Sequence, residues 1–412
     1  MTDYEAALAV LDKAVARLPQ YRRTQAITRN NLANALRNLR RREEALAAVT
    51  RAAQILDELL AEAPDDPLYG ADLAVTRRSL GKLLQEMNRP DEALASFQSA
   101  RASLERLAAR YPTAARHRYY LAQTYNDVVN VLARLRRFDE ALANSQKGLL
   151  VQEKLVADFP QAPQYRSELA TAYMNRGGQL ADLGRSAEAR APFEKALALH
   201  EALAKEYPQL PGYAVNLGGS YCNMGGLLND LGRPEEALTW LAKGVAALEK
   251  VLPKGPHKGT AGAFLCNTLV TRAEALGKLR RYPEALQDWD RALALEEGPR
   301  RTTFRLGRAG TLARAGKHAE AAAEAAALAG GQSASPRLLY DAACVCALAS
   351  AAADASLGER YAARAVELLG RAIDRGYKDA AHLQKDADLD RLRGREDFRR
   401  QVQRLAAKDK PQ

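Results

Sequence analysis

Three aspartates near the end of the sequence have a spacing that could bind a cation. Asp386, Asp388 and Asp390 alternate like the first ligands of a calcium-binding loop between two helices. Such a loop needs glycine at its sixth position and glutamate at its twelfth, where this chain has Arg391 and Asp397. We therefore predict no calcium site, and we expect these carboxylates to accept hydrogen bonds at the N-termini of helices.

Cysteine and histidine are the other residue types that commonly bind metals or attack substrates. Cys344 and Cys346 are close in sequence, but no second pair of cysteines or histidines follows at the spacing of zinc ligands. The four cysteines, which include Cys222 and Cys266, are therefore predicted to be small buried apolar residues without a disulfide framework. The five histidines lie far apart, and no catalytic set can be assembled from the sequence. We predict no catalytic residue, no metal site, no cofactor and no enzyme activity.

A short turn recurs along most of the chain and organises it. Each copy carries a Glu-Ala pair, with an arginine three positions before the glutamate. The glutamates are 48 residues apart, at Glu44, Glu92, Glu140, Glu188, Glu236 and Glu284. In the fifth copy, Gly232 can close one helix in the left-handed conformation and Pro234 can start the next. A fixed period of this size indicates a repeat array in which each unit packs on its neighbours.

Apolar residues recur with the same period and predict two amphipathic helices in each unit. One column consists of Leu36, Leu84, Leu132, Leu180, Leu228 and Leu276. A neighbouring column consists of Leu39, Met87, Leu135, Leu183, Leu231 and Leu279. Both columns are predicted to face the core because they share one face of a helix. A column of prolines from Pro64 to Pro256 is predicted to end the second helix of each unit, which leaves about 20 residues for each helix.

The repeated motif resembles the tetratricopeptide repeat. In one unit the matching residues are Tyr173, Gly177, Leu180, Ala189, Phe193 and Ala196. The usual period of that family is about 34 residues, and we attribute the longer period of this chain to longer helices. The resemblance covers residues 4–329. It implies an all-α fold, a right-handed superhelical solenoid of antiparallel helix pairs.

The register divides the chain into five predicted segments. Residues 1–20 form a half-repeat helix, residues 21–297 form six long helical hairpins, and residues 298–331 form a shorter hairpin. Residues 332–376 form a last hairpin, and residues 377–412 form a charged tail with a short helix. A half-repeat covers only one side of its neighbour. We therefore expect an open apolar face at this end, closed by an upstream domain or by end-to-end self-association with a second copy.

The resemblance also implies a binding role for polar columns on the first helix of each unit. In tetratricopeptide repeats such positions line the inner groove, where asparagine amides bind peptide backbones and basic side chains clamp a carboxylate. Here the columns contain Asn30, Asn31, Asn34, Arg78, Lys82, Asn126, Asp127, Asn130, Asn175, Asn223 and Asn229. The column of Asn34 continues in Gly178, Gly226 and Glu274. An amide both donates and accepts hydrogen bonds, so it can bind an extended backbone of any sequence. The alternative is that these asparagines satisfy helix ends or face water.

The end of the sequence shows a second similarity. Residues 340–346 and 376–398 are similar to the end of repeat regions attached to bacterial serine/threonine kinases of the planctomycete type. Kinase motifs are not found here, since residues 117–119 and 397–399 match the catalytic and metal-binding motifs only in part. The resemblances predict a non-enzymatic scaffold that holds a peptide or partner segment in its groove. The alternative is the regulatory or substrate-docking region of a signalling kinase whose catalytic domain is not in this chain.

Composition restricts the partners. The net charge is +11, but charged residues of both signs make up 27% of the chain, which is typical of a solvated surface. Basic residues do not alternate with aromatic ones, so we expect a protein or peptide partner and no specific nucleic acid. The N-terminus has no signal-peptide pattern, and the longest small and apolar run, 342–353, is too short to span a bilayer. We predict a cytoplasmic protein without a membrane partner.

Overall fold

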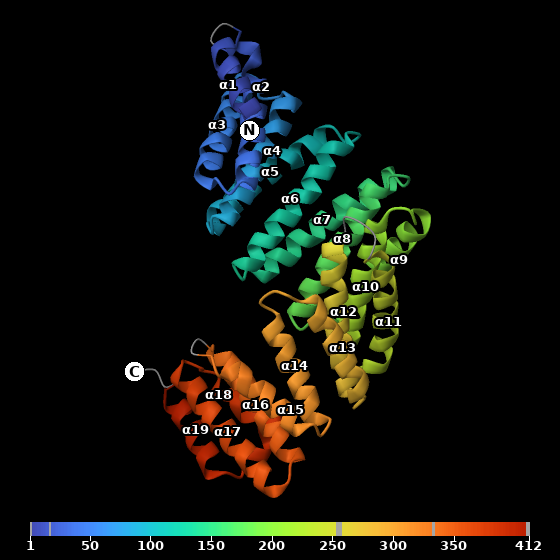
Figure 1. Ribbon diagram of the computed structural model, residues 1–412. Helices are drawn as coiled ribbons and strands as arrows, with labels where there is room; N and C mark the ends of the chain where they lie inside the picture. Colours follow the sequence, from blue (N-terminus) through green and yellow to red (C-terminus); the bar gives the residue numbers. More distant parts are fainter. Residues whose placement is uncertain (1, 16–17, 253–257, 332–333, 409–412) are drawn as a thin grey trace. The chain divides into compact units, whose positions relative to one another are not determined.

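The computed structural model describes residues 2–15, 18–252, 258–331 and 334–408, which fold into α-helices and two short 3₁₀ helices (Figure 1). No β-strand occurs in these ranges. Within them, no helix has both the length and the apolar character needed to cross a membrane. The chain divides into two compact units, Met1–Leu199 and His200–Gln412, each of which contains several repeats. We call these the first and the second unit, and we call a single helical hairpin a repeat. The prediction of an all-α fold built from repeated helix pairs is confirmed.

The first unit consists of helical hairpins that follow an N-terminal helix. That helix, α1 (Thr2–Val15), precedes the 3₁₀ helix η1 (Pro19–Tyr21). The hairpins are α2 (Arg22–Asn38) with α3 (Arg42–Glu62), α4 (Pro67–Glu86) with α5 (Pro90–Arg110), α6 (Ala115–Arg134) with α7 (Phe138–Asp158), and α8 (Pro163–Asp182) with α9 (Ser186–Glu206). The last turns of α9 belong to the second unit. From α3 to α9 the helices have 20 or 21 residues, the length predicted from the period.

The second unit continues with hairpins and ends in a helical tail. The hairpins are α10 (Pro211–Asp230) with α11 (Pro234–Val251), α12 (Lys258–Lys278) with α13 (Tyr282–Leu295), α14 (Arg301–Arg314) with α15 (His318–Ala329), and α16 (Pro336–Ala352) with α17 (Ala355–Asp374). The tail consists of α18 (Ala380–Lys385), η2 (Ala387–Leu392) and α19 (Glu396–Lys408). Its apolar residues Leu383, Leu389 and Phe398 are buried in the same core as α16 and α17. The tail therefore closes the last hairpin.

The recurring turn keeps one backbone conformation in every copy. The residue after the first helix's C-cap has a positive φ, at Arg40, Asn88, Arg136, Gly184, Gly232, Arg280 and Gly316. The left-handed conformation predicted for Gly232 is confirmed by its φ of 72°. The next amide closes the helix, as Arg233 N–H donates to the Leu228 carbonyl at 2.9 Å. The arginine then holds the glutamate three residues on, as in Arg281 and Glu284, whose two bonds are 2.7 and 2.6 Å long. These exposed pairs add little stability, but they mark the start of the second helix.

The two columns that were predicted to face the core differ in their burial. The column from Leu36 to Leu276 is buried throughout, as are the alanines that follow the turn glutamates, such as Ala237. The prediction for the neighbouring column is confirmed only in part: Met87 and Leu135 are half-buried against the core, whereas Leu39 is 57% exposed and Leu231 37% exposed. These residues are the C-caps of their helices, where the chain already leaves the helix axis for the turn. The side chains of this column consequently lie at the edge of the core.

The first helices of successive hairpins form one layer in each unit. In the first unit α4 contacts both α2 and α6, and in the second α12 contacts α10 and α16 contacts α14. The second helices pack behind this layer, as α5 does between α4 and α6. We call the solvent side of the first helices, which carries Asn31, Lys82, Asn130, Asn175 and Asn223, the inner face.

Candidate binding surface

Polar bonds between neighbouring first helices fix the inner face. Arg78 of α4 contacts Asp127 of α6 through Nε at 2.9 Å and Nη2 at 2.8 Å, and its Nη1 donates to Gln123 at 2.9 Å. In the second unit, Lys278 Nζ donates to the carbonyl of Asn229 at 2.8 Å. Arg78 and Asp127 are 49 residues apart, as are Lys278 and Asn229, so each bond joins positions of successive repeats that are offset by one residue from the period of 48.

This geometry changes the role predicted for Arg78. Its side chain is only 8% exposed and its charge is matched by Asp127, another residue of the predicted groove. Arg78 therefore links α4 to α6, which corrects its predicted role as a clamp for an acidic ligand. The structure brings Lys82 to the same place, with Nζ 4.0 Å from Asp127.

The predicted asparagines fall into three groups. Asn31, Asn130, Asn175 and Asn223 are exposed, Asn34 and Asn126 are half-buried, and Asn30 and Asn229 are buried. The four exposed side chains form no hydrogen bond within the part of the chain that the structure describes. Asn30 and Asn229 lie out of reach of a ligand on the surface, which corrects their predicted role. For Asn30 the reason is the helix itself, because one residue corresponds to a rotation of about 100° away from Asn31.

A shallow basic hollow of about 300 Å³ opens on the inner face of the first unit. It is lined by Arg37, Lys82, Gln85, Glu86 and Arg134, from α2, α4 and α6. Three basic side chains thus surround one carboxylate, and Arg37 Nε lies 3.6 Å from Glu86. The pKa of Lys82 is lowered, chiefly by burial, while Asp127 opposes the shift and the positive charge of Arg78 and Arg37 adds to it. The hollow suits an anionic group. The sequence analysis did not identify Arg37 and Arg134 as binding residues, although they lie only one helical turn beyond the predicted polar columns.

Tyrosines adjoin Arg78 on the first unit and were also missed. The ring of Tyr119 lies 5.7 Å from that of Tyr120 and 5.9 Å from that of Tyr165, and Arg78 lies over Tyr120 at 5.9 Å. Burial raises the pKa of the neighbouring Glu168 carboxyl, and Arg78 partly opposes the shift. All three tyrosines are half-buried. They lie in the first two turns of α6 and α8, whereas the predicted polar columns lie nearer the C-terminal ends of these helices.

The second unit has a deeper hollow of about 600 Å³ on its inner face, between α12, α14, α16 and the tail. Its apolar wall includes Val270, Trp289, Phe304, Leu306, Tyr340 and Leu348. Its polar residues include Glu274, Lys278, Arg314, Arg337, Asp341, His382, Asp386 and Asp388. The sequence register placed only Glu274 on this face. The other residues were missed because the period of 48 ends before α14 and because the tail folds back onto α16.

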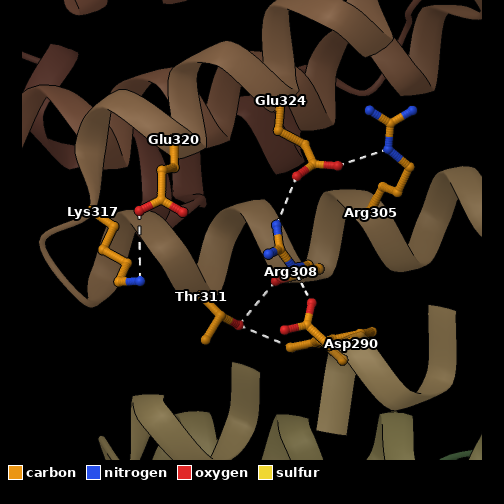
Figure 2. Close-up of polar contacts among 9 residues, drawn as sticks. Asp290, Arg305, Arg308, Thr311, Lys317, Glu320 and Glu324 are labelled. Carbon is orange, nitrogen blue, oxygen red and sulfur yellow. Dashed lines mark hydrogen bonds and ion pairs between the residues drawn. The ribbon is translucent and has the colours of Figure 1, made fainter. Parts of the chain in front are cut away.

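Polar bonds hold α14, one wall of this hollow, against its neighbours (Figure 2). Arg308 donates to Asp290 of α13 at 2.6 Å and to Glu324 of α15 at 3.0 Å. Glu324 also accepts a bond of 2.7 Å from Arg305, and its side chain is only 15% exposed. On the core side, the ring N–H of Trp289 donates to the Thr311 hydroxyl at 3.0 Å. The wall is thus a fixed element, since a shift of α14 would break several bonds to largely buried groups.

Asp386 anchors the tail to the opposite wall. It accepts hydrogen bonds from the Tyr340 hydroxyl at 2.7 Å and from the backbone N–H of Asp388 at 2.9 Å. The predicted role as a helix cap is therefore confirmed for Asp386, at the start of η2. Tyr340 stacks on Tyr377 with ring centroids 4.5 Å apart. Asp388 pairs with Arg314 of α14 at 2.6 Å, so α14, α16 and the tail enclose the hollow together. The four cysteines are buried and unbridged, as predicted.

Comparisons with known proteins agree with this architecture. A family model described as tetratricopeptide repeat matches residues 26–67, 121–161, 169–206 and 217–257. The fold is similar to the apo form of RapI, with a TM-score of 0.55 and 11% identity over 93% of this chain and 98% of that chain. It is also similar to PH0952 from Pyrococcus horikoshii, a signal-transduction ATPase with numerous domains and a tetratricopeptide-repeat sensor. The TM-score is 0.50 and the identity 13%, over 90% of this chain and 53% of that chain. No curated protein sequence matches the chain.

Proposed function

We propose that the chain, which matches a tetratricopeptide-repeat model in four segments, is a non-enzymatic scaffold whose inner face binds an extended segment of a partner protein. The observation that carries the proposal is the set of exposed, unbonded amides of Asn31, Asn130, Asn175 and Asn223. Each side-chain amide has donors and an acceptor, which match the N–H and carbonyl groups of an extended backbone. An exposed amide that bonds nothing else in the described chain keeps this capacity for a ligand.

The spacing of the repeats sets how such a segment is held. The first helices of consecutive repeats contact one another directly, as Arg78 of α4 and Asp127 of α6 do. Neighbouring helices pack about 9–10 Å apart, so equivalent residues of consecutive repeats in one unit lie about 10 Å apart. An extended chain advances about 3.3 Å per residue, so each repeat addresses about three ligand residues. Contacts this sparse give modest affinity and little sequence selectivity. Selectivity then depends on the hollows, and the excess positive charge around Lys82 favours an acidic side chain on the first unit.

Replacing Asn175 and Asn223 together with alanine is expected to reduce peptide binding severalfold without changing the melting temperature. Both side chains are exposed and bond nothing in the described residues, so their loss removes no folded-state contact. The measurement is retention of a random-sequence nonapeptide pool on the immobilised chain. A matched control replaces Gln146 of α7 and Gln287 of α13, which are exposed amides on second helices. Equal retention by both double variants, or unfolding of the asparagine variant, would contradict the proposal.

The alternative function, a regulatory or substrate-docking region of a signalling kinase, would also use the inner face. The two segments that carry the similarity, residues 340–346 and 376–398, are joined by the bond between Tyr340 and Asp386. If a catalytic domain accompanies this chain, the same surface would dock the substrates of that domain or regulate it. A kinase reading frame adjacent to the gene would favour this alternative over a free-standing scaffold.

The N-terminal end supports a further proposal, self-association with a second copy. Leu8 is buried against α2, but Val10 is 68% exposed and Leu18 45% exposed. We expect light scattering to show a molar mass that rises with concentration. The variant Val10→Lys should shift the chain towards the monomer, whereas Leu150→Lys, at a leucine of α7 that is 55% exposed, should not. A monomer at every concentration would contradict the proposal.

A further inference from the structure

The hollow of the second unit holds more negative than positive charge. Its carboxylates are Glu274, Asp341, Asp386 and Asp388, and its basic residues are Lys278, Arg314 and Arg337. Two basic side chains are already neutralised, since Arg314 Nη2 lies 2.6 Å from Asp388 and Arg337 Nε lies 2.9 Å from Asp341. The whole chain has a net charge of +11, so this negative region is a local departure from the rest of the molecule.

Two carboxylates of the hollow are left without a strong basic partner. Glu274 forms no hydrogen bond or ion pair within the described residues, although Lys278 acts on it electrostatically from one turn away. Asp386 accepts hydrogen bonds from Tyr340 and the backbone, and the imidazole of His382 lies 3.6 Å from it. Lys278 itself donates to a backbone carbonyl on α10. After internal pairing, the open part of the hollow therefore faces a ligand mainly with carboxylate oxygens.

Burial is the main cause of the raised pKa values among the ionisable groups of the wall. Burial raises the pKa of the Glu274 carboxyl, and the positive charge of Lys278 opposes the shift only in part. Burial likewise raises the pKa of Asp341, against the opposing effect of Arg337. The pKa of the Cys344 thiol is raised by burial and then by the charges of Asp386 and Asp388. A positive group in the hollow would relieve each of these shifts.

We propose that this hollow binds the basic side chain, arginine or lysine, of the segment held on the inner face. The proposal rests on the proposed function and names the class of residue that the second unit selects. The aliphatic stem of such a side chain would pack on Phe304, Leu306 and Leu348, while its charged end meets Glu274 and Asp386. A metal ion is a poorer fit, because the described residues contain no group of three His, Cys, Asp or Glu arranged to hold one.

Gly277 of α12 keeps the hollow open and provides a way to block it. It lines the hollow, and a Cβ added there would have no heavy atom within 4 Å. A larger side chain at this position would project into the free space without entering the core. Gly307 of α14 differs, since a Cβ added there would lie 2.4 Å from the Trp289 ring. Gly277→Leu is therefore the variant that fills the site and preserves the fold.

The experiment uses nonapeptide pools that are random except for a fixed central arginine, citrulline or glutamate. Citrulline has nearly the size and shape of arginine but carries no charge, because a urea oxygen replaces one guanidinium nitrogen. The full-length chain with Trp240→Phe retains Trp289, which lines the hollow, as its single tryptophan. We expect the arginine pool to be retained about tenfold more than the citrulline pool and to change Trp289 emission. Raising the salt concentration should weaken the preference.

The variants separate charge from shape. Glu274→Gln should reduce the preference for arginine over citrulline severalfold, and Gly277→Leu should abolish both the preference and the change in emission. Gly259→Leu is the matched control, because Gly259 lies on the same helix with no heavy atom within 4 Å of an added Cβ and does not line the hollow. It should behave like the unmodified chain.

The outcomes distinguish this proposal from the proposed function. If arginine and citrulline pools are retained equally but the Asn175 and Asn223 substitutions still reduce retention, the basic-side-chain proposal is overturned and the scaffold stands. A preference for the glutamate pool also overturns it and assigns the hollow to acidic residues. If no pool is retained at all, both proposals fail.

Discussion

Replacing Ala237 with leucine is expected to lower the free energy of unfolding by about 1–3 kcal/mol. Ala237 is completely buried at the start of α11, where every repeat has a buried alanine after the turn. The surrounding hairpin has no spare room, since a Cβ added at Gly225 of α10 would lie only 2.5 Å from Leu241 of α11. Three added carbon atoms would have to separate α10 from α11 or adopt an unfavourable rotamer.

Denaturant unfolding of the second unit, followed by tryptophan fluorescence, measures this loss. The control is Ala246→Leu, an exposed position on the same helix, which should change stability by no more than about 0.5 kcal/mol. An Ala237→Leu chain as stable as the parent would mean that the alanine column does not pack at the helix crossing. The register on which the inner face depends would then be wrong as well.

Mild acid is expected to destabilise the second unit through His200. This side chain is 3% exposed, and its Nδ1 lies 2.7 Å from the Ser220 hydroxyl. Its Nε2 is buried and bonds to nothing within the described residues. Burial lowers the pKa of His200 from 6.5 to about 4. The folded state thus rejects a proton that the unfolded chain accepts.

The sign of the effect follows from this difference. Above pH 6.5 both states are neutral at His200, and the group does not affect stability. As the pH falls from 6.5 to about 4, only the unfolded state is protonated, so the stability decreases. The total loss is about 3 kcal/mol, since each unit of pKa difference corresponds to about 1.4 kcal/mol. Below about pH 4 both states are protonated and the loss levels off.

Urea unfolding at neutral pH and at about pH 4.5 tests the assignment. His200→Gln should remove most of the acid-dependent loss, because glutamine can still bond to Ser220 but does not titrate. His382→Gln, at a side chain that is 41% exposed, should keep the loss unchanged. The same pH dependence in the His200→Gln variant and the parent would assign the acid sensitivity to other groups.

The sequence by itself determined the repeat, its turn and the class of the fold. These features depend on short-range physics: the left-handed residue, the capping amide and the arginine–glutamate pair all lie within a few positions of one another. Gly232 could be placed in the turn on those grounds, and the column of Leu36 could be placed in the core from helical spacing. Four copies of the turn carry Arg or Asn at the left-handed position, yet the period still identified them.

Only the tertiary structure decided which polar residues are available to a ligand. Asn30 and Asn31 are the same residue type at adjacent positions, but one is buried and the other exposed. Arg78 fits the sequence pattern of a ligand clamp, but in the structure it forms an ion pair with Asp127, 49 residues away. The hollow of the second unit exists because the tail returns to α16, and no local pattern encodes that return. The exposure of a side chain and its ion-pair partner depend on how neighbouring helices pack. Packing brings together residues that are far apart in the sequence, and no local pattern indicates which of them will meet.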